Sequence, residues 1–311
     1  MFETTGNILR LDGAVDSLVP RDAVIEELAG GFGFTEGPVW IRDGGYLLFS
    51  DIPNRAIMRW HEDGGVSVFR RPAGFTGAEP PPGPLAGPNG ITLDRAGRLL
   101  VCEHGNRQLV RIEPDGSLTV LADRYQGRRL NSPNDVVCHS RGDIYFTDPP
   151  YGLADKEDDP QRELPHSGLY CLSGGKLRLL YTGVKRPNGL AFSPDEKHLY
   201  LANSDAARRM WLKFAVTAEG DLTEERVLLD VTGHPDAGNP DGMKVDEHGN
   251  LYCTGPGGVW ILTSEGKHLG TIRPPEIPAN CCWGDEDACT LYITARTGLY
   301  RIRLSVRGIR P

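Results

Sequence analysis

The sequence predicts an all-β fold, a six-bladed β-propeller with four-stranded antiparallel blades. Gly and Pro count 39 and 24 of the 311 residues and are spread evenly along the chain. Short alternating strands fall between them, and helical periodicity is nearly absent. A Pro-Asn or Pro-Asp dipeptide recurs at intervals of 45, 54 and 53 residues. Four short strands in a period of about 40–50 residues are typical of propeller blades.

Four copies of the repeat align on this dipeptide. Each copy continues with an apolar strand, a turn and a second apolar strand, and the dipeptides begin at Pro88, Pro133, Pro187 and Pro240. In the first copy the third and fourth strands are expected near residues 109–112 and 118–121. Each copy is therefore expected to form one small sheet that packs its faces against its neighbours.

Two degenerate copies complete the set of six. One begins at Glu36-Gly37-Pro38 and the other near Asn280. The last copy is one strand short, and either segment 8–11 or segment 23–26 could supply that strand and remove the open edge. We therefore predict one propeller domain over residues 1–311, with the N-terminal segment closing the last blade. A solenoid or a pair of sandwiches is the alternative, but no linker-like stretch interrupts the chain.

Composition excludes several classes of function. The net charge is −8 and the basic residues are scattered, so we expect no nucleic-acid partner. No window approaches the run of about 18 apolar residues that a membrane helix needs. Residues 1–10 do not resemble a secretory signal, and four of the seven Cys lie in strand-like apolar runs. We expect buried thiols in a reducing compartment and a cytoplasmic location.

The repeat also predicts a ring of polar side chains. Equivalent residues of a propeller lie at equivalent radius and height, so Asn89, Asn134, Asn188 and Asp241 should meet at one end of the central channel, with Glu36 beside them. An Asn at a strand entry can serve the turn alone. The recurrence in four copies, with a carboxylate in the fourth, favours a ligand shell instead. Oxygen donors without Cys or His suit hard cations such as Ca²⁺, Mg²⁺ or Mn²⁺.

Loops on the same face are candidates for a substrate pocket or lid, namely residues 71–87, 153–166 and 232–239. The shorter connections carry candidate substrate-contact residues, Glu103, His104, Asp148 and Tyr151. Each of these side chains could equally be a satisfied surface group. The chain has no Gly-x-Ser-x-Gly elbow and no Gly-rich phosphate loop, so a serine-triad hydrolase or a nucleotide enzyme is not expected.

Over residues from about Glu36 to Arg303 the chain resembles the gluconolactonase/regucalcin family (senescence marker protein/gluconolactonase-like), with bacterial gluconolactonases closest in appearance. The resemblance is carried by four segments in this order, Thr35-Glu36-Gly37-Pro38-Val39-Trp40, Ser132-Pro133-Asn134-Asp135, Arg186-Pro187-Asn188-Gly189-Leu190 and Pro240-Asp241-Gly242-Met243. The uninterrupted Asp148-Pro149-Pro150-Tyr151-Gly152 is similar to the bacterial members. Ser132 stands where regucalcin-like members carry an Arg, which leaves the substrate open.

The resemblance implies a divalent cation at the channel mouth, Ca²⁺ foremost, with Mg²⁺ or Zn²⁺ as alternatives, and the oxygen ligands leave Mn²⁺ open as well. The implied metal ligands are Glu36, Asn188 and Asp241, and Asn134 is expected to contact the metal, its water or the substrate. The family also implies that Asp241 is the catalytic residue that transfers the proton. Since a metal lowers the pKa of a carboxylate that binds it, Glu36 is the alternative base. Asn89 and Asn134 are expected to bind substrate.

The predicted reaction is the metal-dependent hydrolysis of a small lactone, foremost a sugar lactone such as gluconolactone. Three alternatives stay open on the same fold. One is a promiscuous esterase or phosphotriesterase, and another is a calcium-binding or ligand-binding propeller without activity. The third is a metal-free relative resembling strictosidine synthase, against which the carboxylates of Glu36 and Asp241 count. The natural lactone, the physiological metal and the oligomeric state stay undetermined.

Overall fold

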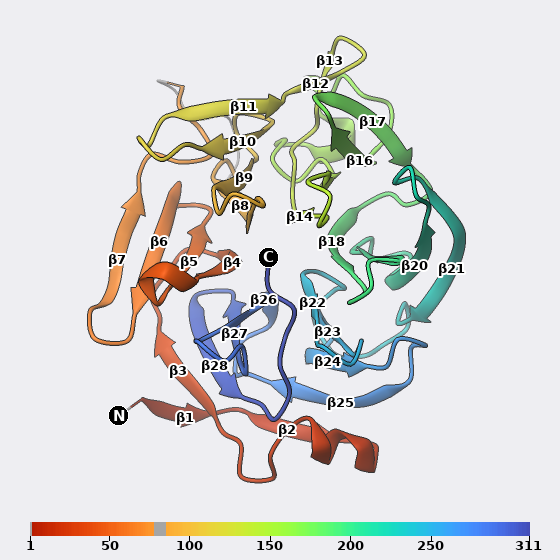
Figure 1. Ribbon diagram of the computed structural model, residues 1–311. Helices are drawn as coiled ribbons and strands as arrows, with labels where there is room; N and C mark the ends of the chain where they lie inside the picture. The colour runs from red at the N-terminus through yellow and green to blue at the C-terminus, as the bar shows by residue number, and fades with distance from the viewer. Residues whose placement is uncertain (1, 78–84) are drawn as a thin grey trace.

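The computed structural model describes residues 2–77 and 85–311, and it has six small antiparallel sheets arranged around a central channel. The predicted six-bladed propeller is confirmed. Figure 1 shows the blades following one another around the ring, with the C-terminus at its centre. The prediction of a pocket loop at 71–87 falls partly on residues 78–84, which lie outside the described residues.

Four blades consist of four consecutive strands. The first contains β4 (Thr35–Ile41), β5 (Tyr46–Asp51), β6 (Ala56–His61) and β7 (Gly65–Arg70), and the second β8 (Pro88–Leu93), β9 (Leu99–Glu103), β10 (Gln108–Ile112) and β11 (Leu118–Ala122). The third contains β14 (Val136–Cys138), β15 (Ile144–Asp148), β16 (Gly168–Ser173) and β17 (Lys176–Tyr181). The fourth contains β18 (Pro187–Phe192), β19 (His198–Asn203), β20 (Met210–Val216) and β21 (Leu222–Asp230).

The last two blades take up strands from the N-terminal segment. The fifth contains β22 (Met243–Val245), β23 (Leu251–Gly255), β24 (Gly258–Leu262), β25 (His268–Arg273) and, at its outer edge, β2 (Asn7–Arg10). The sixth contains β26 (Pro278–Gly284), β27 (Thr290–Ala295), β28 (Gly298–Arg303), β3 (Ile25–Ala29) and β1 (Glu3–Thr5). Of the two candidate closing segments, residues 25–29 pair with β28, while residues 7–10 pair with β25 of the preceding blade.

Short elements connect the blades. They are the hairpin of β12 (Arg124–Tyr125) and β13 (Arg128–Arg129) and the 3₁₀ turns η1 (Gly13–Ser17), η2 (Arg42–Gly44) and η3 (Lys156–Asp158). Within the described ranges, no helix is long and apolar enough to cross a membrane.

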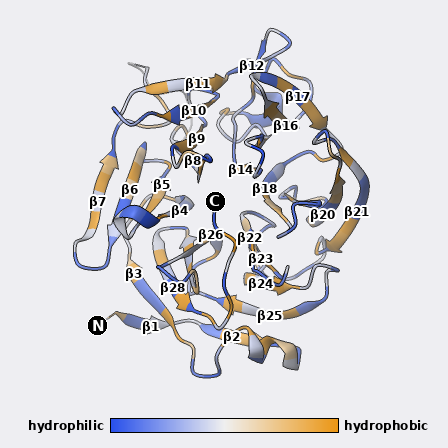
Figure 2. Cartoon of the chain, viewed as in Figure 1, coloured by the Kyte–Doolittle hydropathy of each residue, from blue (hydrophilic) through white to orange (hydrophobic). Residues whose placement is uncertain are grey.

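The core consists of six hydrophobic clusters, one between each pair of neighbouring blades. Between the sixth and first blades, for example, Tyr292 stacks on Trp40 with ring centroids 5.2 Å apart. Figure 2 shows hydrophobic residues concentrated in the strands and polar residues in the connecting loops. Because every blade buries both faces against its neighbours, the first strands are held at a constant radius around the channel.

Candidate active site

The repeated glycines let neighbouring blades approach closely at one end of the channel. A Cβ atom on Gly37 would lie 2.0 Å from the carbonyl oxygen of Asn89 in the next blade, and Gly37 has a positive φ of 51°. A Cβ atom on Gly189 would lie 2.2 Å from the carbonyl oxygen of Asp241. Since real Cβ atoms do not approach backbone so closely, only glycine fits here. The side chains that precede the glycines are therefore brought together.

Hydrogen bonds from side-chain hydroxyls to backbone carbonyls hold neighbouring blades at this short separation. Ser50 Oγ donates to the Asn89 carbonyl at 2.6 Å, and Thr147 Oγ1 donates to the Asn188 carbonyl at 2.9 Å. Ser204 Oγ donates to the Pro240 carbonyl at 2.5 Å. Because these hydroxyls lie at the ends of the second strands, each second strand positions the first strand of the following blade.

Three predicted asparagines form a continuous chain of hydrogen bonds across the channel mouth. Asn89 Nδ2 donates to Asn134 Oδ1 at 2.8 Å, and Asn134 Nδ2 donates to Asn188 Oδ1 at 2.6 Å. Asn188 Nδ2 then donates to Ser204 Oγ at 2.8 Å. Each amide oxygen can accept at two lone pairs, so Asn134 and Asn188 each retain acceptor capacity. The structure therefore brings Asn89, Asn134 and Asn188 together.

His104 contacts Asn89, the first member of this chain of hydrogen bonds. Its Nδ1 lies 3.1 Å from the Leu85 carbonyl oxygen, which can only accept, so Nδ1 carries the proton. Its Nε2 lies 3.1 Å from Asn89 Nδ2 and accepts from it. Burial lowers the pKa of His104 to about 4, which keeps the imidazole neutral. Both hydrogens of Asn89 Nδ2 are therefore committed, one to His104 and one to Asn134.

The two predicted carboxylates differ in how many hydrogen bonds they accept. Glu36 Oε2 accepts from the Gly37 amide at 2.6 Å and from Asn280 Nδ2 at 2.9 Å. Asp241 Oδ1 is completely enclosed and has no hydrogen-bond partner among the described residues. An enclosed oxygen without a donor is costly, which is why it points to a missing ligand.

Burial and the charges of neighbouring carboxylates raise the pKa of both carboxyl groups. Burial, followed by the charge of Asp135, raises the pKa of Glu36 to about 7. Burial, followed by the charges of Glu36 and Asp135, raises the pKa of Asp241 well above its ordinary value. A cation bound to both carboxylates would stabilise their charged forms and so oppose these shifts.

The donor set fits a hard divalent cation. It offers carboxylate oxygens from Glu36 and Asp241 and an amide oxygen from Asn188, which are ligands that Ca²⁺ and Mg²⁺ prefer. Nowhere in residues 2–77 and 85–311 do three or more His, Cys, Asp or Glu side chains converge as a metal cluster. A cation at this point would therefore depend on asparagine oxygen as well as on carboxylates.

Tyr151 also lies at this mouth. Burial, followed by the charge of Asp241, raises the pKa of Tyr151, while contacts with Ser204 and Asn188 lower it. The Arg186 guanidinium lies 6.0 Å from the centre of the Tyr151 ring. Tyr151 therefore joins the asparagine chain to the wall formed by the loop after β15.

The loop 153–166 is held against the ring by two arginines. Arg186 forms a bidentate ion pair with Glu157, with Nε–Oε1 at 2.9 Å and a second bond of 3.1 Å from the other nitrogen to Oε2. Buried Arg107 donates to the Gln161 carbonyl at 2.9 Å and to the Leu130 carbonyl at 2.7 Å. These contacts fix the loop against the neighbouring blades.

Asp148 and Glu103, two of the predicted substrate contacts, instead accept hydrogen bonds from residues near them in the fold. Asp148 accepts from the backbone amides of Asn131 and Ser132, both at 2.8 Å. Glu103 accepts from Asn106 and Gln108, both at 2.7 Å. These bonds give both carboxylates the local role of fixing loops, and no bond joins either one to the asparagine chain.

Sequence reasoning gave no role to three residues that the structure brings to the channel, Asp135, Asn280 and Lys244. Asp135 and Asn280 occupy the position that is glycine in the other four blades, one residue beyond the asparagine ring. The departure of Asn134-Asp135 from Asn-Gly is the signal that could have singled out Asp135. A cavity of about 520 Å³ opens at the opposite end of the channel, beside Lys244 and the C-terminal residues.

Known proteins resemble the chain over nearly its full length. The family profile described as the SMP-30/gluconolactonase/LRE-like region matches residues 34–297. A gluconolactonase of Zymomonas mobilis is 38% identical over 318 residues, covering 98% of this chain and 88% of that protein.

Two solved structures illustrate the likeness in three dimensions. A gluconolactonase of Xanthomonas campestris superposes with a TM-score of 0.84 at 33% identity, covering 97% of this chain and 96% of that one. A calcium-binding protein, regucalcin, from Agrobacterium tumefaciens superposes with a TM-score of 0.72 at 20% identity, covering 91% and 97%, which shows a common fold.

Proposed function

The chain belongs to the SMP-30/gluconolactonase/LRE-like family, and we propose that it hydrolyses a small sugar lactone, such as gluconolactone, with the help of a bound divalent cation. One observation carries the proposal. Asp241 Oδ1 is enclosed and unpaired at the point where Glu36 and the asparagine chain converge. The Zymomonas and Xanthomonas relatives, both called gluconolactonases, support the substrate class.

Glu36, Asn188 and Asp241 would hold the cation, which supplies a Lewis acid at the channel mouth when bound. The calcium-binding regucalcin of the same fold supports Ca²⁺ as the first ion to test. Glu36 serves as a ligand in this proposal because its Oε2 is already held by the Gly37 amide and by Asn280. Those two bonds fix the carboxylate and make it a poor acceptor of a transferred proton.

Asp241 is the general base in this proposal. The Asp241 carboxylate oxygen that does not bind the cation accepts a proton from the water that attacks the lactone carbonyl carbon, and it then returns that proton to the ring oxygen as the ring opens. The products balance as one lactone and one water giving one hydroxy acid. Losing such a base typically costs about 10²–10⁴-fold in rate.

Asn134 is the substrate donor that the hydrogen bonds favour. One hydrogen of its Nδ2 is committed to Asn188, and the second is free to donate to a lactone oxygen. Asn89 has no donor left, since His104 and Asn134 occupy both of its amide hydrogens. Asn89 therefore acts by orienting Asn134, and His104 acts by orienting Asn89.

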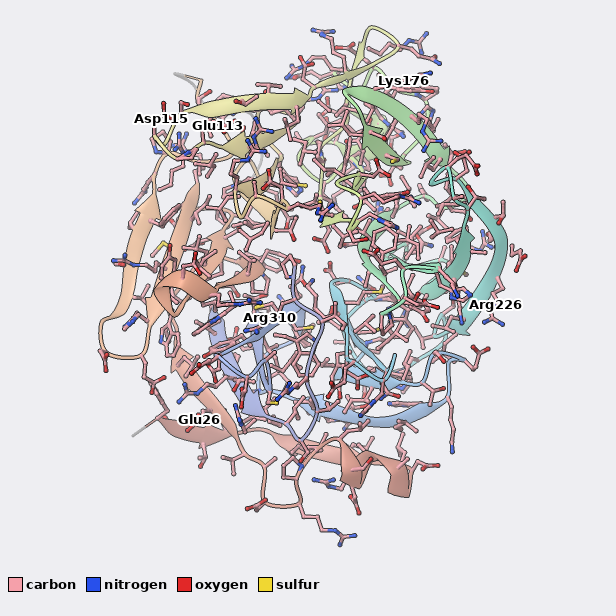
Figure 3. The ribbon with its side chains drawn as sticks, viewed as in Figure 1. Glu26, Glu113, Asp115, Lys176, Arg226 and Arg310 are labelled. Carbon is pink, nitrogen blue, oxygen red and sulfur yellow. The ribbon has the colours of Figure 1, made fainter. Side chains whose placement is uncertain are left out.

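The test compares Asp241→Asn and Asn188→Ala with the matched control Asp115→Asn. Asp115 lies at the outer edge of the ring, where Figure 3 shows it far from the channel, and it accepts hydrogen bonds from Ser117. We expect Asp241→Asn to lose about 10²–10⁴-fold in the rate of gluconolactone hydrolysis. We expect Asp115→Asn to keep the wild-type rate. Wild-type rates in both channel variants would refute the assignment.

A further inference from the structure

The channel has a second polar level below the asparagine ring. At this level four blades have glycine, and the other two contribute the side chains of Asp135 and Asn280. A Cβ atom on Gly242 would lie 2.1 Å from Asn280 Oδ1, and a Cβ atom on Gly90 would lie 2.7 Å from Asp135 Oδ1. The space above the glycines is therefore filled by these two polar groups.

Asp135 brings a third carboxylate into the channel. It is only 4% exposed, and its Oδ1 accepts from the Val136 amide at 2.8 Å. Its Oδ2 is enclosed and has no hydrogen-bond partner in the part of the chain that the structure describes. Its charge also acts on Glu36 and Asp241, since it raises the pKa of both. Because Asp135 directly follows Asn134, its carboxylate lies one residue further along the channel than the asparagine ring.

Lys244 lies on the far side of these carboxylates. It is on β22, three residues after Asp241, and it lines the 520 Å³ cavity at the other end of the channel. Its Nζ donates to the Met243 carbonyl at 3.0 Å, and no ion pair joins it to a carboxylate of the described residues. Pro38 and Val136, which come two residues after Glu36 and one residue after Asp135, line the same cavity as Lys244. Although burial raises the pKa of Asp135, the Lys244 charge is the largest opposing effect, and it also lowers the pKa of Glu36.

The charges of this region balance only when Lys244 is counted. Three carboxylates carry three negative charges, and one divalent cation supplies two positive charges. A single charge left over in a buried channel is costly, because burial penalises unpaired charge. The Lys244 ammonium would bring the sum to zero. A second divalent cation would instead leave an excess of positive charge.

We propose that Lys244 is an internal counter-charge that completes the neutralisation of Glu36, Asp135 and Asp241, and thereby limits the site to one divalent cation and tunes its affinity. This inference rests on the cation binding in the proposed function. It makes Lys244 a positioning residue, which acts through the electrostatic potential at the cation ligands and not by contact with substrate. The cation affinity is then a property of both levels of the channel.

The direction in which Ca²⁺ affinity changes when Lys244 is replaced separates this electrostatic role from a merely structural one. Removing a positive charge near a cation site should tighten Ca²⁺ binding, whereas structural damage should weaken it. We expect Lys244→Met to bind Ca²⁺ about 5–150-fold more tightly than wild type, the usual range for two coupled groups. Lys244→Arg keeps the charge and should restore wild-type affinity. Asp135→Asn should weaken binding, and Asp135→Asn combined with Lys244→Met should return it toward wild type.

The experiment is calorimetric titration of each purified variant with CaCl₂, with bound calcium counted by elemental analysis and folding checked by thermal unfolding. If Lys244→Met does not fold, the effect of that substitution is read in the Asp135→Asn background, where one negative charge is also removed. Unchanged or weaker Ca²⁺ binding in folded Lys244→Met would overturn the inference.

The outcomes also separate this inference from the proposed function. Wild-type protein that binds no Ca²⁺ and hydrolyses no lactone would overturn both. Wild-type protein that binds one Ca²⁺ and hydrolyses lactone, with no tighter binding in Lys244→Met, would overturn only the role of Lys244.

Discussion

Replacing Gly189 by Ala tests how the close approach of two blades builds the site. The added Cβ would lie 2.2 Å from the Asp241 carbonyl oxygen and 2.6 Å from the Gly242 Cα. Both atoms are backbone, so no side chain can swing away. Since carbon atoms pack at about 3.5–4.0 Å, the fourth and fifth blades would have to separate by about 1 Å.

That separation should cost stability and affinity together. Overpacking of this kind typically costs about 1–3 kcal/mol of unfolding free energy. For a chain of this size each kcal/mol lowers Tm by about 2–4 °C, so a fall of several degrees is expected. Because Asn188 and Asp241 precede the two glycines that meet here, the same displacement should pull two cation ligands apart. Ca²⁺ should then raise Tm less in Gly189→Ala than in wild type.

The assay is thermal unfolding of each protein at a series of Ca²⁺ concentrations. Gly233→Ala is the matched control, since a Cβ atom there meets no atom within 4 Å and its φ is not positive. The control should match wild type in Tm and in its response to Ca²⁺. If Gly189→Ala shows the same Tm and the same response as wild type, the close approach does not position the site.

Three further predictions concern the walls of the site. Asn134→Ala removes the side chain that donates to Asn188. We expect the unfolding free energy measured in urea to fall by about 1–3 kcal/mol and kcat to fall by about 10²–10³-fold. An unchanged kcat would count against the proposal. Burial raises the pKa of Asp148 from 3.8 to about 7, so the folded protein keeps that proton when the unfolded chain has lost it. The unfolding free energy of wild type relative to Asp148→Asn should therefore be greatest below pH 4, fall by up to about 1.36 kcal/mol per pH unit toward pH 7, and then level off. Urea unfolding from pH 3.5 to 8 checks this, and a difference independent of pH would contradict it. Glu157→Gln weakens the bidentate pair with Arg186, so we expect a severalfold higher KM with nearly unchanged kcat and faster proteolysis within 153–166; equal KM and equal cleavage would argue against this wall.

The fold and the asparagine ring could be predicted because a propeller repeats. One dipeptide, read at its intervals along the chain, indicates four of the six blades and the equivalence of Asn89, Asn134 and Asn188, and the two remaining blades follow from degenerate copies of the repeat. The closing strand stayed ambiguous because residues 8–11 and 23–26 are both strand-like, and each in fact pairs with a different blade.

The second level of the channel could not be predicted in the same way. Asp135 and Lys244 are 109 positions apart in the chain, and the charge of one acts on the other only because the first strands of two different blades line the same channel. Nor does composition reveal that loop 153–166, with its many charges, is pinned by Arg107 and Arg186. Such contacts across the ring depend on packing between distant segments, and no local pattern encodes them.

The central claim is that oxygen donors from several blades hold one divalent cation on which lactone hydrolysis depends. The most direct measurement strips the protein with a chelator, assays gluconolactone hydrolysis, and repeats the assay as Ca²⁺ is returned while bound calcium is counted. The account predicts negligible hydrolysis by the stripped protein and full recovery at one bound equivalent. Full activity in protein that contains no divalent cation would contradict it.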